Sequence, residues 1–329
     1  MRARRHRAAL LACGAALFAW LVYRMGPATI LESFRMLSWR IVPLIVFPCV
    51  ALKLFDALAW RFAFSRAPAP LMPLFTSTLA GQAVASTTPT GALGRNATMA
   101  WMVRDRVGLR DSLSSLIIVQ TTSTASQGLF LLLGIVLARW TLPSSPPLVR
   151  IMQWLLLLEA LGVAGFVAVQ MRGVVAGGHG LLGRLGFSGG ARVGEAAEHI
   201  DRALVEYYRH QPRRLTLSLI CNFFGWMTRA VETWLILYLI GAAVSVGMAL
   251  IIEAFATGIS FATFFLPMDI GVEEGGAVAT FLALGLSGAT GLSFSLVRRV
   301  REVAWTALGL LLLAGDRPPS PARLHTQGA

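Results

Sequence analysis

Charged side chains occur inside or beside long apolar segments, where such residues are rare and usually functional. A charge at the centre of a membrane helix costs roughly 2.5 to 3.5 kcal/mol, so fourteen of them facing lipid would cost on the order of 35 kcal/mol. We therefore expect them to face one another or water or, in a few cases, to stay protonated. The six bases and eight acids are Lys53, Arg95, Arg229, Arg298, Arg299 and Arg301, and Asp56, Glu159, Glu232, Glu253, Asp269, Glu273, Glu274 and Glu302.

Two basic and acidic pairs have the same three-residue spacing, which puts both members of a pair on one helix face. Lys53 precedes Asp56, and Arg229 precedes Glu232. Each is expected to form an internal ion pair that either holds helices in register or belongs to a substrate path. The spacing alone does not distinguish these two roles.

Four ionisable residues fall within the five positions 298–302, which is more than helix register requires. Arg298, Arg301 and Glu302 share one side of a helix, whereas Arg299 lies about 100° away. Arginine suits phosphate and carboxylate groups, because its planar guanidinium can donate two parallel hydrogen bonds. The cluster therefore predicts a polar path for a headgroup.

Glu273 and Glu274 follow Gly271 and are expected to face this arginine cluster. A helix N-terminus also favours carboxylates without any further function. Glu159 and Glu253 have no basic neighbour in their own segments, and no role is assigned to them. The predicted substrate path consists of Arg298, Arg299, Arg301, Glu302, Glu273, Glu274, Asp269, Arg229, Glu232, Lys53, Asp56, Arg95 and Gln120.

The segment Gln120–Gln127 is strongly polar for a bilayer helix, since seven of its eight side chains carry a hydroxyl or an amide. Such residues often form interhelical hydrogen bonds worth about 0.6 kcal/mol each. We favour the other interpretation, in which the segment lines a cavity.

Sequence patterns for a metal, nucleotide or nucleophilic active site do not occur. The five histidines lie outside the apolar segments, and there is no HExxH, CxxC, GxSxG or phosphate-binding loop pattern. The three cysteines each lie in an apolar stretch and are interpreted as packing residues. We expect no cofactor, no bound metal and no enzymatic activity.

The composition is that of an integral membrane protein. Apolar residues make up 56 % of the chain before its 32 glycines are added, whereas soluble domains reach about 45 to 50 % with glycine included. The net charge of +13 raises the question of nucleic acid binding, but the arginines are scattered between apolar runs, as in loops beside a membrane. We expect no nucleic acid partner.

Six apolar runs are long enough to cross a bilayer as helices, and two further stretches are interrupted. The interruptions lie at Thr87–Gly91 and Pro267–Gly271, so each interrupted stretch predicts a re-entrant hairpin of two short helices. The fold class is thus all-α and polytopic. The six spans are Ala8–Tyr23, Ile41–Phe62, Ser112–Ala138, Leu148–Gln170, Leu215–Ile240 and Gly291–Leu313, and the hairpins are Leu71–Val103 and Val244–Leu286.

Basic residues are distributed unequally between the two sides of this arrangement. Eighteen fall on one side and five on the other when each hairpin returns to its own side. Cytoplasmic loops carry the excess of arginine, so both termini are expected in the cytoplasm. Replacing each hairpin by two full spans leaves this orientation unchanged. Met1–Arg7 resembles the start of a signal peptide, but Tyr23–Met25 lacks a cleavage pattern, so we interpret the segment as the first span.

The longest connection between spans, residues 171–214, contains an amphipathic stretch at Val193–Tyr208. Its apolar face carries Ala197, Ile200, Leu204 and Tyr208. The pattern is typical of a helix on an anionic lipid surface, and a solvated connector is the alternative.

Similar landmarks recur at a near-constant offset, which predicts an internal duplication. The two charge pairs are 176 positions apart, and Gly108 and Gly285 are 177 apart. Gly94 with Gly271 and Gly128 with Gly309 recur at similar offsets. Because the second and fifth spans run in opposite directions, the halves form an inverted repeat, as in transporters with a midplane site. The predicted parts are 1–170 (first half), 171–214 (connector), 215–315 (second half, with span 4 the repeat partner of span 1) and 316–329 (cytoplasmic tail).

The chain resembles the flippase-like transmembrane domain of lysylphosphatidylglycerol synthases, most closely its HpnL-type branch associated with hopanoid biosynthesis. The resemblance implies a bacterial inner-membrane protein that moves an amphiphilic lipid, a hopanoid-type isoprenoid lipid or a phospholipid, between leaflets. It rests on Phe264–Gly276, Ala283–Leu286, Ser295–Glu302, Trp305–Leu310 and, in the first half, Ser126–Gly134.

Two departures from the family pattern concern the first half. Arg95-Asn-Ala97 and Ala100 stand where a Gly-Gly-acid element with a following arginine is usual, and Gln120-Thr121 replaces an acid and arginine pair. They predict a different or less charged headgroup in this half. Because the chain ends shortly after Leu313, we expect no aminoacyl-lipid synthase activity. The competing functions are a scaffold that recruits lipid-biosynthesis enzymes through 171–214 and a membrane lipid transferase.

Overall fold

The computed structural model describes residues 41–65, 69–88, 91–141, 146–171, 191–262 and 272–315, and all regular structure in them is α-helical. The predicted first span and the tail lie outside the described residues. The helices are α3 (Ile41–Phe62), α4 (Leu71–Thr87), α5 (Gly91–Val107), α6 (Leu109–Thr141), α7 (Pro146–Met171), α9 (Ala191–His210), α10 (Pro212–Leu239), α11 (Val246–Ala262), α12 (Val272–Ala283) and α13 (Gly288–Gly315).

The helix positions agree with the apolar segments that the sequence indicates. The first interrupted stretch ends one helix at Thr87 and begins the next at Gly91, as predicted from its Thr-Pro-Thr-Gly break. The second break, at 267–271, lies outside the described residues. An all-helical membrane fold is therefore confirmed for the described part.

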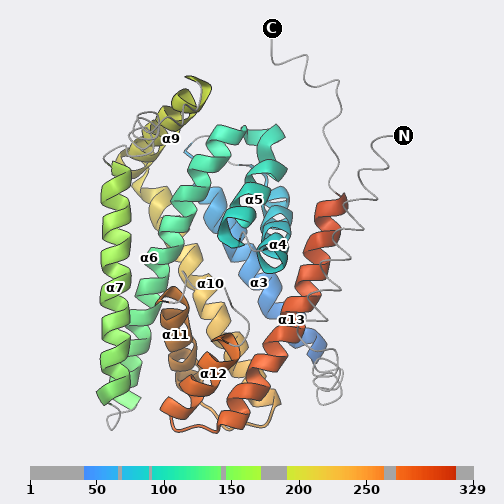
Figure 1. The fold of residues 1–329 in the computed structure, drawn as a ribbon, viewed down its shortest axis with the longest axis vertical. Helices are drawn as coiled ribbons and strands as arrows, with labels where there is room; N and C mark the ends of the chain where they lie inside the picture. The colour runs from blue at the N-terminus through green and yellow to red at the C-terminus, as the bar shows by residue number, and fades with distance from the viewer. Residues whose placement is uncertain are drawn as a thin grey trace.

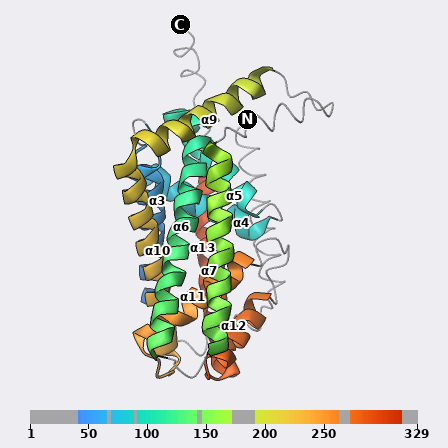
Figure 2. The ribbon, with the colours of Figure 1, turned by 90° about the vertical axis from the view of Figure 1, so that its left-hand side faces the viewer.

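The two interrupted stretches occupy opposite ends of the molecule. Figures 1 and 2 place α4 and α5 in the upper half and α11 and α12 in the lower half, beside the long helices α6, α7, α10 and α13. Helices α4, α5 and α11 have 17 residues and α12 has 12. A 17-residue helix is about 26 Å long, shorter than the roughly 30 Å of hydrocarbon in a bilayer.

Two described helices are long and apolar enough to cross a membrane by length and composition, namely Leu109–Thr141 and Val149–Gln170. The other long helices, α3, α10 and α13, carry the charged residues described below. Their charges require protein partners, which the packing provides.

Helices from the two predicted halves pack directly on each other. Helix α3 lies along α10, α13 along α4, and α6 along α11. Glycines permit the closest approaches. A methyl group at Gly309 would lie 2.5 Å from the backbone oxygen of Leu79 on α4, and one at Gly134 would overlap Ala254 on α11.

This packing predicts that Gly309→Val destabilises the protein, because α13 must move away from the α4 backbone. We expect a loss of about 1 to 3 kcal/mol in the free energy of unfolding. The measurement is the thermal unfolding midpoint of the purified variants. Gly165→Val on α7 is the control, since a Cβ there meets no atom within 4 Å. Equal midpoints for the two variants would contradict the close α13 and α4 contact.

Two glycines that the predicted duplication pairs with each other have similar backbone conformations. Gly108 joins α5 to α6 with φ +76°, and Gly285 precedes α13 with φ +74°. Residues with a side chain rarely adopt positive φ, because the Cβ atom crowds the following carbonyl oxygen. The recurrence of glycine at this offset thus has a structural reason, a left-handed turn after each short helix pair.

Helix α9 packs on the protein through its apolar side. Ile200, Leu204 and Tyr207 are buried in one hydrophobic cluster with Trp60 of α3. The Tyr207 hydroxyl donates to the carbonyl of Phe62 at 3.0 Å. Of the predicted face, Tyr208 is half-buried and the side chain of Ala197 lies outside the described residues. The described part of this apolar face is thus covered by other helices of the protein.

Candidate functional site: a buried charge network

Ten charged side chains from α3, α5, α10, α11 and α13 form what we call the charge network. Six are basic and four are acidic. Its members are Lys53, Asp56, Arg95, Arg229, Glu232, Glu253, Arg298, Arg299, Arg301 and Glu302.

Two salt bridges connect α13 to α10 and α11. Arg301 donates to Glu232 of α10, and Arg298 donates to Glu253 of α11 at 2.7 Å. The hydroxyl of Thr233 donates to the same Glu253 oxygen at 2.7 Å. Glu232 and Glu253 are 1 % and 2 % exposed. These carboxylates are therefore held by charge-assisted hydrogen bonds out of contact with solvent.

The predicted pairing of Arg229 with Glu232 on α10 is wrong. Glu232 binds Arg301, and its expected partner Arg229 instead stacks over the Trp226 ring at 4.8 Å. Likewise Arg298 turns to Glu253 rather than to the residue four positions later on its own helix. An arginine side chain is long enough to reach a neighbouring helix, where the carboxylate has better alignment and deeper burial than one on its own surface.

Glu302 lies on the α4 side of α13. Ser86 of α4 donates to Glu302 at 3.1 Å, and Arg299 lies 4.0 Å from it. Arg299, which lies about 100° around the helix from Arg298, is buried as well. The charged segment of α13 thus has two contact sides, with Arg298 and Arg301 on one and Arg299 and Glu302 on the other.

The predicted pair on α3 is confirmed. The ammonium of Lys53 donates to Asp56 at 2.9 Å, and Lys53 is 5 % exposed. This contact forms within one helix, where a three-residue spacing brings the two side chains together.

Positive charge is in excess around Asp56. The charges of Lys53, Arg95 and Arg229 all act on its carboxylate, from α3, α5 and α10. Neither Arg95 nor Arg229 forms a salt bridge with any carboxylate of the described residues, and the buried Nε of Arg95 has no hydrogen-bond partner among them. Two guanidinium groups therefore remain available beside one carboxylate that is already paired.

Four of the predicted path residues are not among the described members of the charge network. Asp269 and the side chains of Glu273 and Glu274 lie outside the described residues. Gln120 is exposed on α6. The sequence assigned no role to Glu253 and did not single out Ser86 or Thr233, although all three bind network members.

The polar segment Gln120–Gln127 of α6 forms hydrogen bonds to α10. This is the interhelical role that the sequence left as the alternative to lining a cavity. Thr122 and Ser218 of α10 lie 2.9 Å apart, and Asn222 donates to Thr122 at 3.1 Å. Ser126 donates to the carbonyl of Leu219 at 2.8 Å. These contacts hold α6 against α10 and do not point into a cavity.

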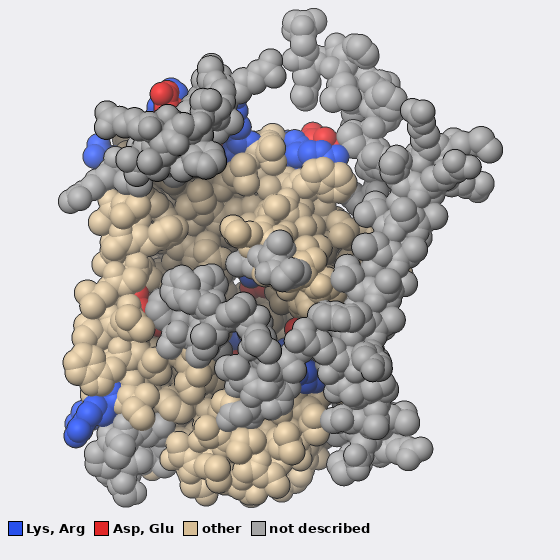
Figure 3. Space-filling model, in the orientation of Figure 1, with Lys and Arg blue, Asp and Glu red and all other residues tan. Residues whose placement is uncertain are grey.

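Charge is visible at the centre of the molecule as well as at its end. Figure 3 shows basic and acidic atoms at mid-height, framed by uncharged side chains, and a second group at the upper end. If the long helices cross the bilayer, mid-height is the centre of the hydrocarbon, where a charge is most costly. The network therefore needs a polar surrounding or a polar ligand.

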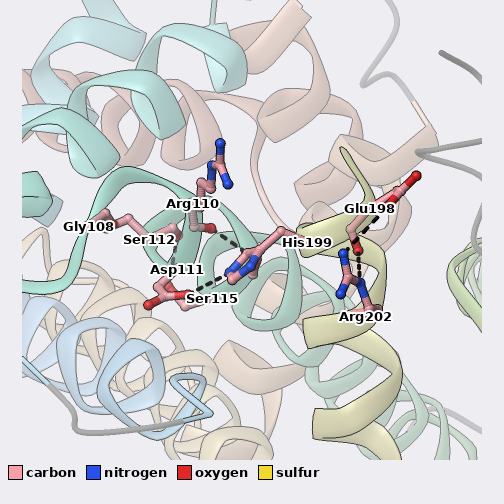
Figure 4. Close-up of polar contacts among 9 residues, drawn as sticks. Gly108, Arg110, Asp111, Ser112, Ser115, Glu198, His199 and Arg202 are labelled. Carbon is pink, nitrogen blue, oxygen red and sulfur yellow. Dashed lines mark hydrogen bonds and ion pairs between the residues drawn. The ribbon is translucent and has the colours of Figure 1, made fainter. Parts of the chain in front are cut away.

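A second polar region lies at the end where α9 crosses α6. His199 of α9 contacts Asp111 of α6 at 2.9 Å, and Glu198 contacts Arg202 at 3.5 Å along α9 (Figure 4). A cavity of about 530 Å³ beside them is lined by Arg104, Asp105, Arg106, Asp111, His199, Arg202 and Glu206, among others. The side chains that line this cavity are both basic and acidic and are half-exposed, so the cavity favours neither an anionic nor a cationic ligand.

The family of the chain is shown by its sequence. A family model described as the lysylphosphatidylglycerol synthase TM region matches residues 7–309. The chain belongs to this family. No curated protein and no solved structure matches it.

Membership in the lysylphosphatidylglycerol synthase TM family makes the chain a membrane protein that acts in lipid metabolism or transport. The match includes every member of the charge network. The closer likeness to an HpnL-type branch stays a prediction.

Proposed function

We propose that the protein is an inner-membrane lipid flippase or transporter that moves an amphiphilic lipid between leaflets past the charge network. The observation that carries the proposal is the pair of arginines, Arg95 and Arg229, which lie near Asp56 and form no salt bridge with any described carboxylate. Buried guanidinium groups bind phosphate or carboxylate oxygens strongly. The headgroup is therefore anionic, as in a phospholipid or an acidic derivative of a hopanoid-type lipid.

The crossed packing of the two halves supports an alternating-access mechanism. Helix α13 of the second half packs on α4, and α6 of the first half packs on α11. Short helix pairs at opposite ends, together with the equivalent turns at Gly108 and Gly285, are what an inverted repeat requires. In such a repeat the substrate binds near the midplane and is reached from either side in turn.

The proposed orientation places both termini and α9 in the cytoplasm. We expect reporter fusions at Ala329 and within residues 141–147 to report opposite sides of the membrane, because α6 and α7 meet at that connection and basic residues predominate at the other end. Fusions are scored with one reporter active only in the cytoplasm and one active only outside. A non-cytoplasmic signal at Ala329 would contradict the inverted-repeat arrangement.

The functional test is leaflet-resolved lipid analysis of the purified protein in liposomes. Arg95→Gln and Arg229→Gln should each slow lipid movement roughly tenfold or more, because each removes a charge-assisted hydrogen bond to the headgroup. Both should fold normally, since neither loses a salt bridge. Arg202→Gln, at an exposed position of α9, is the matched control and should move lipid at the parental rate.

A lipid-moving protein does not convert its substrate, so no new covalent lipid product should appear in these liposomes. Parental protein that moves no more lipid than empty liposomes would overturn the proposal in favour of the scaffold function. A covalently altered lipid would favour the transferase.

A further inference from the structure

Glu159 is a buried carboxyl group that takes no part in the charge network. It is 1 % exposed, and neither of its carboxyl oxygens has a hydrogen-bond partner among the described residues. It therefore differs from Glu232 and Glu253, which are equally buried but are held by arginines.

The position of Glu159 is the middle of a membrane-facing helix. Helix α7 runs from Pro146 to Met171, and its other sides expose large apolar residues such as Trp154, Leu158 and Leu161. Glu159 itself is directed at Gly128 of α6. A Cβ atom added at Gly128 would lie 3.8 Å from the Glu159 carboxyl group, so the glycine leaves room for that group. The carboxyl group thus lies between α6 and α7, near the midpoint of α7.

The charged residues nearest to Glu159 along α7 and along α6 are more than two helical turns away. Arg150 on α7 is nine residues away, or about 13 Å along the axis, and on α6 Arg139 is eleven residues from Gly128, or about 16 Å. On α11 the charge of Glu253 is paired with Arg298, and α9 contacts α7 at Gln170 through Tyr208. No described charge acts on Glu159.

A carboxylate cannot stay ionised in such surroundings without a counter-charge or hydrogen-bond donors. Burial in an apolar interior strongly favours the neutral acid over the anion. The arrangement therefore requires Glu159 to carry a proton in this conformation and to release it only when water reaches it.

Polar side chains lead from one end of α7 toward this position. The Tyr208 hydroxyl of α9 donates to the Gln170 side chain at 2.8 Å, and the Gln170 amide donates to Thr121 of α6 at 3.3 Å. Thr121, Thr124 and Gly128 follow one another along the same face of α6, about 10 Å from first to last. A route of hydroxyl and amide groups thus covers part of the distance between the α9 end and Glu159.

We propose that Glu159 is a proton-binding site at the centre of the membrane, and that its protonation and deprotonation couple lipid movement to a proton gradient. The coupling rests on the proposed lipid transport, whereas the proton site rests on the burial and isolation of Glu159 alone. The two parts are therefore tested separately.

The proton site is tested by reaction of the full-length protein in liposomes with dicyclohexylcarbodiimide. This apolar reagent adds to protonated carboxylic acids within membranes and leaves a stable N-acylurea, which peptide mass spectrometry locates. We expect labelling at Glu159 that falls as pH rises. Glu253, equally buried but paired with Arg298, and Glu198, exposed on α9, should remain unlabelled and serve as internal controls. An unlabelled Glu159 at every pH would overturn the proton site.

The coupling is tested by lipid distribution under an imposed pH gradient. With one proton per lipid, a gradient of one pH unit should produce up to about a tenfold unequal leaflet distribution that reverses with the gradient. Glu159→Gln, a permanently neutral side chain of the same shape, should abolish this response and still fold. Glu159→Asp and Glu198→Gln should keep it.

The outcomes separate the two ideas. A Glu159→Gln protein that follows the gradient like the parent would overturn the coupling. Lipid movement in the parent that ignores the gradient would also overturn it, while leaving the proposed function intact. If the parent moves no lipid at all, the proposed function fails and the coupling fails with it, and the labelling result still decides whether Glu159 holds a proton.

Discussion

Replacing Glu232 with glutamine is expected to lower the free energy of unfolding by about 3 to 5 kcal/mol. The substitution removes the carboxylate that pairs with Arg301, so the largely buried charge of Arg301 is left without its partner. Arg301→Met should cost a similar amount, since it strands Glu232. The double variant Glu232→Gln/Arg301→Met should recover part of the loss, because neither charge is then left alone. Chemical or thermal unfolding of the purified proteins in detergent measures all three.

The partner assignment is tested by two double-mutant cycles that share Glu232. The cycle with Arg301 should give a coupling energy of about 1 to 3 kcal/mol, as residues in direct contact do. The cycle with Arg229, which stacks on Trp226 instead, should give a value close to zero. A larger coupling with Arg229 would restore the pairing within α10 that the sequence spacing suggested.

Asp56→Asn is expected to be the second severely destabilising change, with a loss of about 3 to 5 kcal/mol. It removes a negative charge on which Lys53, Arg95 and Arg229 all act, so the repulsion among these three positive charges is less compensated. Adding Lys53→Met to Asp56→Asn should restore stability in part. The same unfolding measurement applies.

The control for this prediction is Asp105→Asn, which also removes a carboxylate next to an arginine but at a half-exposed position. Surface salt bridges contribute about 0 to 1 kcal/mol, so this variant should unfold close to the parent. If Asp56→Asn is as mild as Asp105→Asn, the carboxylate of Asp56 is open to water and the excess of positive charge around it is solvated.

The two stability predictions bear directly on the proposed function. Paired charges such as Glu232 with Arg301 fix α13 against α10, and their loss should be measured as instability. Arg95 and Arg229 have no such pair among the described residues, so their loss should be measured as slower lipid movement. Stability and transport should therefore respond to different members of the same network.

The sequence by itself determined which segments are helices and where the first short helix pair breaks. Hydrophobicity over about 20 residues is a property of the chain alone, and so is the steric effect of a Thr-Pro-Thr-Gly interruption. The Lys53 and Asp56 pair was predictable for the same reason, since both side chains leave one helix a single turn apart. Family membership likewise follows from the sequence, because the match extends over residues 7–309.

Only the tertiary structure decided which charges meet between helices. Sequence spacing fixes the angle of a side chain on its own helix but not the neighbour toward which that helix turns. The three-residue spacing of Arg229 and Glu232 was therefore outweighed by the approach of α13, which brings Arg301 to Glu232. The same limit applies to the polar face of α6, which meets α10, and to Glu159, whose isolation depends on how α6 packs against α7. A buried polar group is stabilised by its best-aligned partner, and that partner is set by helix packing rather than by distance along the chain.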